Sequence, residues 1–236
     1  ADVCEIYTDV DGVYTADPRF VPNAYKLDDI SYDEMLELAS LGANVLHNRS
    51  VEMAKKYHVK LAVKSSLTRA EGTYVKEVDQ VEKMLVRGVT RDNDCARIAL
   101  CGVEDTPGKA FQIFSMLSKK GISVDLIIQS IGDGETKDIS FTVREDDLEP
   151  ALTVLKENKD SVNAKKVVWT KDVSKVSIVG TGMVNNAGVA TTMFEALYNA
   201  HININMIATS EIKISVLVDQ KDAERAVVAI HDRFLL

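Results

Sequence analysis

Hydrophobic and polar positions follow two periods over about the first 75 residues, one typical of strands and one of helices. The stretch VCEIYTDV has the composition of a strand, and SYDEMLELASLG predicts a helix with both ends marked. Ser31 is the expected N-cap, Glu34 its reciprocal capping-box partner, and Gly42 the stop. We expect a second helix to start at Ser50 and run through VEMAKKYH, followed by a strand in VKLAVKSS. Strand, helix, helix and strand in this order predict part of an α/β sheet.

An internal repeat organises the rest of the chain. ARIALCGVEDTPGKAFQIFSMLSKKGISVDLIIQS aligns with SKVSIVGTGMVNNAGVATTMFEALYNAHININMIATS at an offset of 80 residues (188 minus 108). Gly108 then matches Gly188, and Asp125 matches Asn205. Each copy continues with a strand, DISFTV or KISVLV, and a helix, DDLEPALTVLKE or DAERAVVAIHDR. The order β-α-β-β-α-β predicts two ferredoxin-like units.

The two copies of the repeat differ at their ends. The first closes with a fourth strand, AKKVVWT, whereas the second reaches Leu236 directly after its last helix. A spare strand-like segment, MLVRGVT from Met84 to Thr90, precedes the first copy. We expect it to complete the second sheet, which makes the first unit an insertion within the second. The expected parts are an α/β portion (1–75), a linker with the extra strand (76–90), the first unit (91–171) and the second unit (172–236).

Composition and charge exclude several classes of protein. The 236 residues carry a net charge of −8, so no broad positive field favours nucleic acid or anionic lipid, and we expect neither as a partner. No apolar run approaches the roughly 20 residues that span a bilayer, and the first residues lack a signal-peptide layout. We therefore expect a cytoplasmic protein. Cys4, Cys95 and Cys101 lack metal-ligand or CxxC spacing and are expected to be reduced thiols, without a metal site.

The turn GTGMVNNAG follows a strand and precedes a helix, as a dinucleotide-binding turn does. Asn185 stands where a third glycine is required, and no unit with a ribose-binding acid follows, so we exclude an oxidoreductase. The glycines let the chain turn from strand to helix, and the helix N-terminus also suits the carboxylate of an amino acid. The loops EDTPGKA and VNNAGVA are thus candidate ligand sites. Asp105 is a candidate for a ligand's ammonium group, and Gln129 for a polar side chain.

Paired units of this kind resemble ACT domains, the amino-acid-sensing modules of biosynthetic enzymes. YTDVDGVYTADPR, ISYDEMLELASLGANVLHNRSVEMAKKY and IATSEIKISVLVD, in this order, resemble the C-terminal two-thirds of an aspartokinase, which phosphorylates the side-chain carboxylate of aspartate. The resemblance covers essentially the whole chain. It implies an α+β protein in which tandem ferredoxin-like (βαββαβ) ACT domains follow a fragment of an α/β amino-acid-kinase domain. The chain is then expected to begin inside the kinase domain, after its Lys-Phe-Gly-Gly motif and most aspartate contacts.

The resemblance also implies a nucleotide site. Aspartokinases transfer a phosphoryl group from ATP with Mg2+, so both are expected cofactors of the intact enzyme. Without the first part of the kinase domain we expect no complete catalytic set, no cofactor and no aspartate phosphorylation by this chain alone. Asn44 stands where the family often has a lysine, so a cationic contact is lost there. The residues implied to meet ATP are Thr8, Asp9, Tyr14, Asp17, Arg19 and Asn44.

The resemblance implies an enzyme that catalyses the first step of the lysine, threonine and methionine pathway. It also implies feedback inhibition by lysine, threonine or both. Two different effectors, or one bound twice, are both compatible with the sequence, and a homodimer through the ACT domains is expected to cover their sheet edges. The alternative is a stand-alone amino-acid-sensing ACT module, which would not need the kinase-like first 75 residues. The implied effector-binding residues are Asp105, Thr106, Gly108, Lys109, Ala110, Ser123, Asp125, Gln129, Ala187, Gly188, Val189, Asn203, Ile204, Asn205, Thr209, Ser210 and Glu211.

Overall fold

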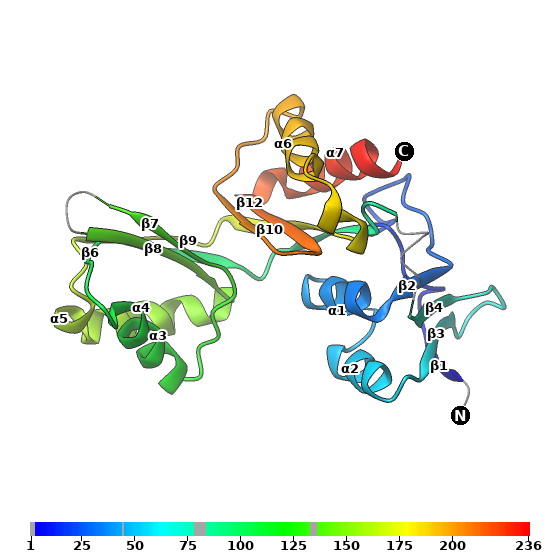
Figure 1. Cartoon of the computed structure of the whole chain (residues 1–236), viewed down its shortest axis with the longest axis horizontal. Coiled ribbons are helices and arrows are strands. Elements are labelled where there is room, and N and C mark those ends of the chain that lie inside the picture. The colour runs from blue at the N-terminus through cyan, green and yellow to red at the C-terminus, as the bar shows by residue number, and fades with distance from the viewer. Residues whose placement is uncertain (1–2, 44, 78–83, 133–135) are drawn as a thin grey trace. The chain divides into compact units, whose positions relative to one another are not determined.

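The computed structural model describes residues 3–43, 45–77, 84–132 and 136–236, which form three four-stranded sheets (Figure 1). The chain divides into two compact units. One unit contains residues 1–92 together with 175–236, and the other contains residues 93–174. The expected α+β class is confirmed. Within the described ranges, no helix has the length and apolar character that a membrane crossing requires.

The first sheet has the strand order β1-β3-β4-β2 and belongs to the N-terminal portion. β1 runs parallel to β3, and β4 runs antiparallel to β3 and parallel to β2. Helices α1 and α2 lie on the same side of this sheet (Figure 1), where Met35, Leu38 and Val63 are fully buried. The elements are β1 (Val3–Thr8), β2 (Asp29–Ser31), α1 (Tyr32–Ser40), α2 (Asn48–Lys56), β3 (Lys60–Ser65) and β4 (Thr73–Lys76).

The predicted ends of α1 are confirmed, but the predicted start of α2 is wrong. Ser31 and Glu34 form the capping box, and Gly42 follows the helix with φ of 105°. Helix α2 begins at Asn48 because His47, not Ser50, is its N-cap. The His47 ring nitrogen Nδ1 accepts a hydrogen bond from the Arg49 amide at 3.2 Å, which is the role that a serine oxygen has at other N-caps. The short strands β2 and β4 were not predicted.

The separate unit, residues 93–174, has the predicted ferredoxin-like order, with strands arranged β7-β8-β6-β9. All three neighbouring pairs are antiparallel. Helices α3 and α4 cover one face (Figure 1), where Ile98 and Phe141 of the sheet and Leu117 of α3 are buried in one core. The elements are β6 (Ala96–Glu104), α3 (Lys109–Lys119), β7 (Ile127–Ile131), β8 (Thr136–Val143), α4 (Leu148–Glu157), α5 (Lys159–Val162) and β9 (Lys166–Thr170).

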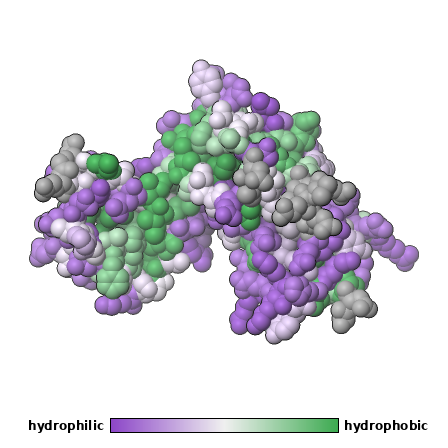
Figure 2. Space-filling model, in the orientation of Figure 1, coloured by the Kyte–Doolittle hydropathy of each residue, from purple (hydrophilic) through white to green (hydrophobic). Residues whose placement is uncertain are grey.

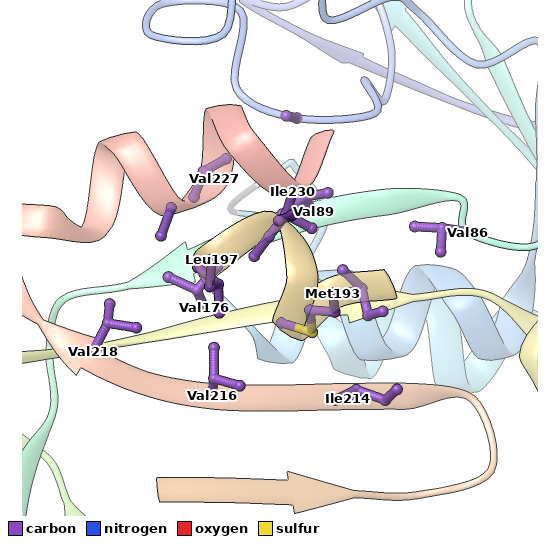
Figure 3. Close-up of a cluster of buried hydrophobic side chains, with 14 of the residues drawn as sticks. Val86, Val89, Val176, Met193, Leu197, Ile214, Val216, Val218, Val227 and Ile230 are labelled. Atoms are coloured by element: carbon purple, nitrogen blue, oxygen red, sulfur yellow. The ribbon is translucent and has the colours of Figure 1, made fainter. Parts of the chain in front are cut away.

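The second ferredoxin-like sheet has the order β11-β12-β10-β5. Its fourth strand, β5, pairs antiparallel with β10, with Val89 opposite Ile178. This pairing is the one expected for the spare strand, so the first ferredoxin-like unit is inserted within the second. Figure 3 shows the core that β5 helps to form, with Val89, Val176 and Ile230 pointing toward one another. The elements are β5 (Gly88–Asp92), β10 (Val173–Val179), α6 (Val189–Asn199), β11 (Met206–Thr209), β12 (Lys213–Asp219) and α7 (Ala223–Leu235).

Candidate ligand sites and the residues that connect them

The segment expected to meet ATP follows β1 and is shaped by local hydrogen bonds. The Thr8 hydroxyl donates to the Val10 carbonyl at 2.9 Å and accepts from the Val10 amide at 3.1 Å. The Tyr14 hydroxyl donates to Asp11 at 2.9 Å, and partial burial together with this carboxylate raises the pKa of Tyr14. Asp9 is exposed. The predicted residue Asn44 lies outside the described residues.

Asp17 and Arg19 form an ion pair at the end of this segment. Arg19 donates to Asp17 through Nη2 at 2.6 Å and through Nε at 3.0 Å, and its guanidinium lowers the pKa of the Asp17 carboxyl group. The Arg19 side chain is 86% exposed. Two nitrogens of the Arg19 guanidinium therefore already bond to a carboxylate. A nucleotide phosphate would have to displace Asp17 from Arg19 or bind Arg19 together with it.

The same segment is fixed at two points within its own unit. The Thr73 hydroxyl accepts from the Val13 amide at 2.8 Å and donates to the Leu27 carbonyl at 2.6 Å. Further along, the Thr15 hydroxyl lies 2.9 Å from Nε2 of His231 on helix α7, and the Thr15 carbonyl accepts from the Val89 amide at 2.7 Å. The second ferredoxin-like sheet and its last helix thus hold the candidate nucleotide segment.

His231 is fully buried at this contact. Burial lowers the pKa of its imidazole, while Asp232, with Oδ1 3.6 Å from Nδ1, opposes that shift. The ring is therefore held in its neutral form, which can accept a hydrogen bond from Thr15. Sequence reasoning missed this residue, because a histidine in an amphipathic helix gives no local sign of a partner 216 positions away.

The first candidate effector turn, between β6 and α3, is open. Residues 104–108 are exposed, and Gly108 caps α3 with φ of 90°. A Cβ added to Gly108 would meet no atom within 4 Å. Asp105 pairs with Lys137 on β8 at 3.2 Å, and the Lys109 ammonium donates to the Ser161 carbonyl at 3.1 Å, which holds it against α5. The expected ammonium-binding carboxylate therefore already has a lysine ammonium beside it.

The remaining predicted residues of this unit lie on β7, before β7, or near the start of α3. Gln129 is the middle residue of β7 and pairs with Ile139, two positions along β8 from Lys137, so Gln129 and Lys137 are on one face of the sheet. Ser123 and Asp125 precede β7, at its other end, where the Asp125 amide donates to the Thr142 carbonyl at 3.0 Å. Thr106 and Ala110 stay with the turn. The structure thus places Asp105 near the end of β7, Gln129 at the middle of that strand, and Ser123 and Asp125 before its start.

The second candidate turn, between β10 and α6, has a different environment. Ala187 and Gly188 are exposed, but the Val189 side chain is buried in the core and is not available to a ligand. The amide of Gly180 donates to the Ile212 carbonyl at 3.0 Å, which brings the start of this turn to the β11–β12 hairpin. The hairpin contains the exposed residues Thr209, Ser210 and Glu211.

Asn203, Ile204 and Asn205 precede β11 and therefore lie at the opposite end of that strand from the hairpin. The Asn205 side chain donates to Asp219 at 3.0 Å, and Ile204 packs against the core. Within one copy of the chain, these three residues and Thr209 to Glu211 do not converge on one point. The resemblance had implied that all six residues belong to effector binding.

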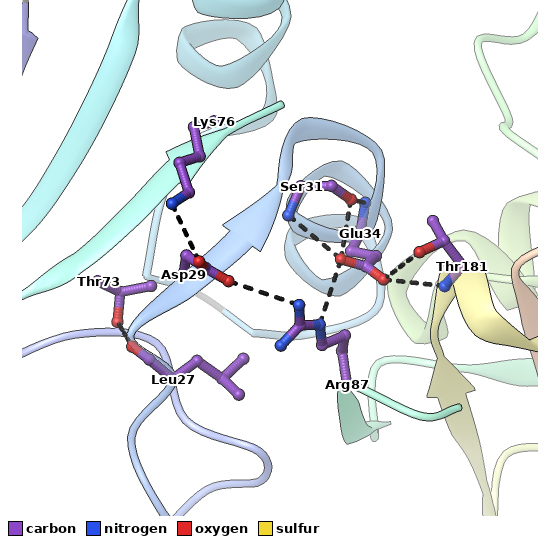
Figure 4. A network of polar contacts seen from close by, with 8 residues as sticks. All are labelled: Leu27, Asp29, Ser31, Glu34, Thr73, Lys76, Arg87 and Thr181. Atoms are coloured by element: carbon purple, nitrogen blue, oxygen red, sulfur yellow. Dashed lines mark hydrogen bonds and ion pairs between the residues drawn. The ribbon is translucent and has the colours of Figure 1, made fainter. Parts of the chain in front are cut away.

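A buried polar network joins the β10–α6 turn to helix α1 (Figure 4). Glu34 is 1% exposed, and its Oε1 accepts from the Thr181 amide at 2.9 Å and from the Thr181 hydroxyl at 2.7 Å. Arg87, just before β5, places Nε 3.7 Å from Oε2 of Glu34 and Nη2 3.5 Å from Asp29. Asp29 also pairs with Lys76 at 3.0 Å. Sequence reasoning found the capping role of Glu34 but not its contact with Thr181.

Comparison with known proteins fits this architecture. The ACT domain profile matches residues 98–158 and 176–234, which are the two ferredoxin-like units, and the amino acid kinase family profile matches residues 1–65. The solved regulatory subunit of aspartate kinase from Thermus thermophilus is 39% identical with a TM-score of 0.60, over 64% of this chain and 99% of that one. This chain belongs to the aspartokinase family. The expected resemblance is confirmed.

Longer aspartokinases match the entire chain. The Pseudomonas aeruginosa aspartokinase is 47% identical over 239 residues, covering 100% of this chain and 58% of that protein. This chain thus spans somewhat more than half the length of the curated relatives it matches. E. coli aspartokinase III is 28% identical. Its structure with aspartate and ADP (R-state) has a TM-score of 0.86, and the match covers 53% of that protein. Its structure with lysine and aspartate (T-state) has a TM-score of 0.81, and the match covers 52% of that protein. Both matches cover 100% of this chain.

Proposed function

We propose that this chain contains the regulatory region of a cytoplasmic enzyme that phosphorylates L-aspartate to 4-phospho-L-aspartate with ATP and Mg2+. In this proposal its ACT domains bind end-product amino acids, lysine or threonine, and inhibit the kinase. The observation that carries the proposal is that the second ACT domain and the kinase portion contact each other directly. Thr15 and Glu34 of the kinase portion bond to His231 and Thr181, and Arg87, just before β5, pairs with Asp29. E. coli aspartokinase III, solved in complex with lysine, supports an amino-acid effector.

The effector sites of this proposal are the turns at the N-termini of α3 and α6. The N-cap residue of each helix is a glycine, Gly108 for α3 and Gly188 for α6, so neither helix has a side-chain hydrogen bond at its N-cap. The first amide groups of such a helix present donors and a partial positive charge to a ligand carboxylate. In the first turn, Asp105 can bind the ligand's ammonium group in place of Lys137, and Gln129 can bind a polar side chain.

The nucleotide side of the proposal uses the segment from Thr8 to Arg19. Arg19 is the exposed cation suited to phosphate, and its Asp17 partner keeps the guanidinium oriented. Among the described residues, no group of three or more His, Cys, Asp or Glu side chains could hold a metal ion. Mg2+ is commonly bound through nucleotide phosphates and water, so the proposal does not require such a group.

We further propose that the ACT domains form a homodimer. The first ACT sheet ends in β7 and β9, where Ile131 is 82% exposed and Trp169 is 47% exposed. Edge strands with exposed apolar side chains are ready to pair with another copy of the same sheet. Figure 2 shows hydrophobic residues at the visible surface of the ACT units, whereas the visible face of the kinase portion is mostly hydrophilic. Light scattering after size-exclusion chromatography should give twice the chain mass, and a monomer at micromolar concentration would contradict the dimer.

The test of effector binding is thermal unfolding of this chain with each amino acid, and with lysine and threonine together. A ligand at 100 times its dissociation constant stabilises the folded state by about 2.7 kcal/mol, which raises the melting temperature by a few degrees. We expect this shift with lysine or threonine and not with their D-enantiomers. If no amino acid shifts the melting temperature of this chain, the regulatory part of the proposal fails.

A further inference from the structure

The Glu34 carboxylate is shared between two structural elements that belong to different domains. We propose that Glu34 is the positioning residue through which the β10–α6 turn of the second ACT domain controls the N-terminal end of helix α1 in the kinase portion. The proposal rests on the proposed function only for the biological direction of the signal, from effector to kinase. The mechanical link itself can be tested without any ligand.

The two oxygens of Glu34 have separate tasks. Oε2 accepts from the Ser31 amide at 3.2 Å and from the Ser31 hydroxyl at 2.8 Å, which closes the capping box of α1. Oε1 accepts both hydrogen bonds from Thr181. A buried carboxylate needs such charge-assisted bonds, and losing two of them costs more than at the surface. Movement of Thr181 therefore changes the environment of the residue that caps α1.

The β10–α6 turn that holds Thr181 is tightly packed. A Cβ on Gly180 would lie 2.4 Å from the Leu85 carbonyl oxygen, and one on Gly182 would lie 2.6 Å from the Met84 carbonyl oxygen. Thr181 thus stands between two close approaches of its backbone to the segment that leads into β5. Because the backbone is close-packed there, a displacement of the turn must also move the segment that leads into β5.

Arg87 supplies the second arrangement that a relay requires. Its side chain is 9% exposed, its Nε lies 3.7 Å from Oε2 of Glu34, and this nitrogen has no hydrogen-bond partner among the described residues. A closed guanidinium–carboxylate contact is shorter, roughly 2.7–2.9 Å. If Thr181 withdraws from Oε1, Arg87 can close onto Oε2, the oxygen that also accepts from Ser31, and stabilise the carboxylate in its place. The open and the closed Arg87 contact are two discrete states, and these can carry coupling between sites.

Helix α1 is well placed to convey such a change. It follows β2 directly, and Asp29 on β2 lies between Arg87 and Lys76. The end of α1 leads to Gly42, whose added Cβ would lie 2.4 Å from the Arg91 carbonyl oxygen on β5. The start and the end of α1 thus both contact the segment 85–92, so a shift of Glu34 is passed on to this segment, whose Val89 amide donates to the Thr15 carbonyl of the candidate nucleotide segment at 2.7 Å.

The first experiment measures amide hydrogen exchange of the 236-residue chain without ligand. Thr181→Val removes the hydroxyl and keeps the side-chain shape. We expect it to speed exchange of the α1 amides at 34–37 by about tenfold, because the cap of that helix is weakened. Thr192→Val is the matched control, since the Thr192 hydroxyl donates at 3.0 Å to the carbonyl of Gly188, the N-cap of its own helix, and makes no other hydrogen bond to the residues that the structure describes. Unchanged α1 exchange in Thr181→Val would overturn the proposal.

The second experiment tests the exchange of partners. Arg87→Met is combined with Thr181→Val and compared with each single variant. We expect the effect of Arg87→Met on α1 exchange to be at least about threefold larger in the Thr181→Val background, because Arg87 is then the remaining donor to Glu34. Equal effects in both backgrounds would rule out Arg87 as the alternative partner. Thr181→Ser, which keeps the hydroxyl, should restore wild-type exchange and separates hydrogen bonding from packing.

A third arm adds L-lysine at about 10 mM, a concentration that saturates a site of millimolar or tighter affinity. We expect lysine to change α1 exchange in the wild type, and to shift the melting temperature but leave α1 exchange unchanged in Glu34→Gln. If lysine does not shift the melting temperature of the wild type, lysine is not the effector. The relay through Glu34 is then tested by the two ligand-free experiments. If lysine binds and alters α1 equally in Glu34→Gln and wild type, Glu34 is not the relay.

Discussion

The two ACT units share one order of elements but differ in what touches their first turn. In the first unit, residues 104–108 are exposed, and a Cβ added to Gly108 would meet no atom within 4 Å. In the second unit, Gly180 and Gly182 press against backbone, and Thr181 bonds to a buried carboxylate. The difference lies at the start of the turn, where Thr181 binds Glu34; at its end, the N-cap glycines Gly108 and Gly188 are both open, since an added Cβ would meet no atom within 4 Å at either.

The sequences of the two turns agree with this difference. At the offset of 80, Asp105 is matched by Asn185 and Cys101 by Thr181. The first copy thus keeps the carboxylate that can bind an ammonium group, while the second has the hydroxyl that binds Glu34. We expect ligand recognition to depend chiefly on the first turn and transmission to depend on the second.

The largest effect that would sharpen this comparison comes from adding one methyl group at Gly180, at the start of the second turn. Gly180→Ala should destabilise the fold by about 3 kcal/mol, because its Cβ would lie 2.4 Å from a carbonyl oxygen, and backbone must move. Gly188→Ala, in open space with φ of −85°, should change stability by less than about 1 kcal/mol. Urea unfolding of both variants measures the difference. A loss in Gly180→Ala as small as that in Gly188→Ala would mean that the start of the second turn is not tightly packed.

A smaller effect concerns the last helix of the second ACT unit. Burial lowers the pKa of His231, so the unfolded chain takes up the proton first, and stability should be full above about pH 6.5 and fall as the pH drops below that value. His231→Gln should cost about 1–2 kcal/mol at pH 8, through the weakened bond to Thr15, and should flatten the fall between about pH 7 and pH 5. Urea unfolding at several pH values measures both. A fall as steep as in the wild type would place the titrating group elsewhere.

The smallest effect is expected at the open turn. Asp105→Asn breaks a pair in which the Asp105 side chain is 49% exposed, so stability should change by less than about 0.5 kcal/mol. Its effect on amino-acid binding should be larger than its effect on stability. Isothermal titration with the amino acid that shifts the melting temperature checks this. Unchanged affinity would remove Asp105 from the effector site.

Local signals and topology were enough to predict much of the fold, and long-range contacts were not. The capping box of Ser31 and Glu34 follows from residues three positions apart, and the place of β5 follows from counting strands. His47 was missed because histidine is an unusual N-cap. Strands β2 and β4, with three and four residues, are too short to show a period. The contact of Glu34 with Thr181 spans 147 positions and has no local cue.

The candidate sites show the same limit. The structure places Asp105 beside Lys137, which is opposite the last residue of β7, whereas Gln129 lies at the middle of that strand. Asn205 and Thr209 are close in sequence, but strand β11 carries them to opposite ends. A strand advances roughly 3.3 Å per residue. The four steps along the chain from Asn205 to Thr209 therefore place these two residues farther apart than the length of an amino acid ligand.

The pairing of β5 with β10 has a consequence for how modular the molecule is. Asp92 and Lys175 face each other at the end of this antiparallel pair, and the whole first ACT unit, residues 93–174, lies between them in sequence. In topological terms β5 and β10 are a hairpin whose loop is a complete folded domain. Two residues are enough to connect such strands, so an Asn-Gly linker between Asp92 and Lys175 can replace the domain without stretching the second sheet. The first ACT unit is thus an insertion into a single hairpin of the second.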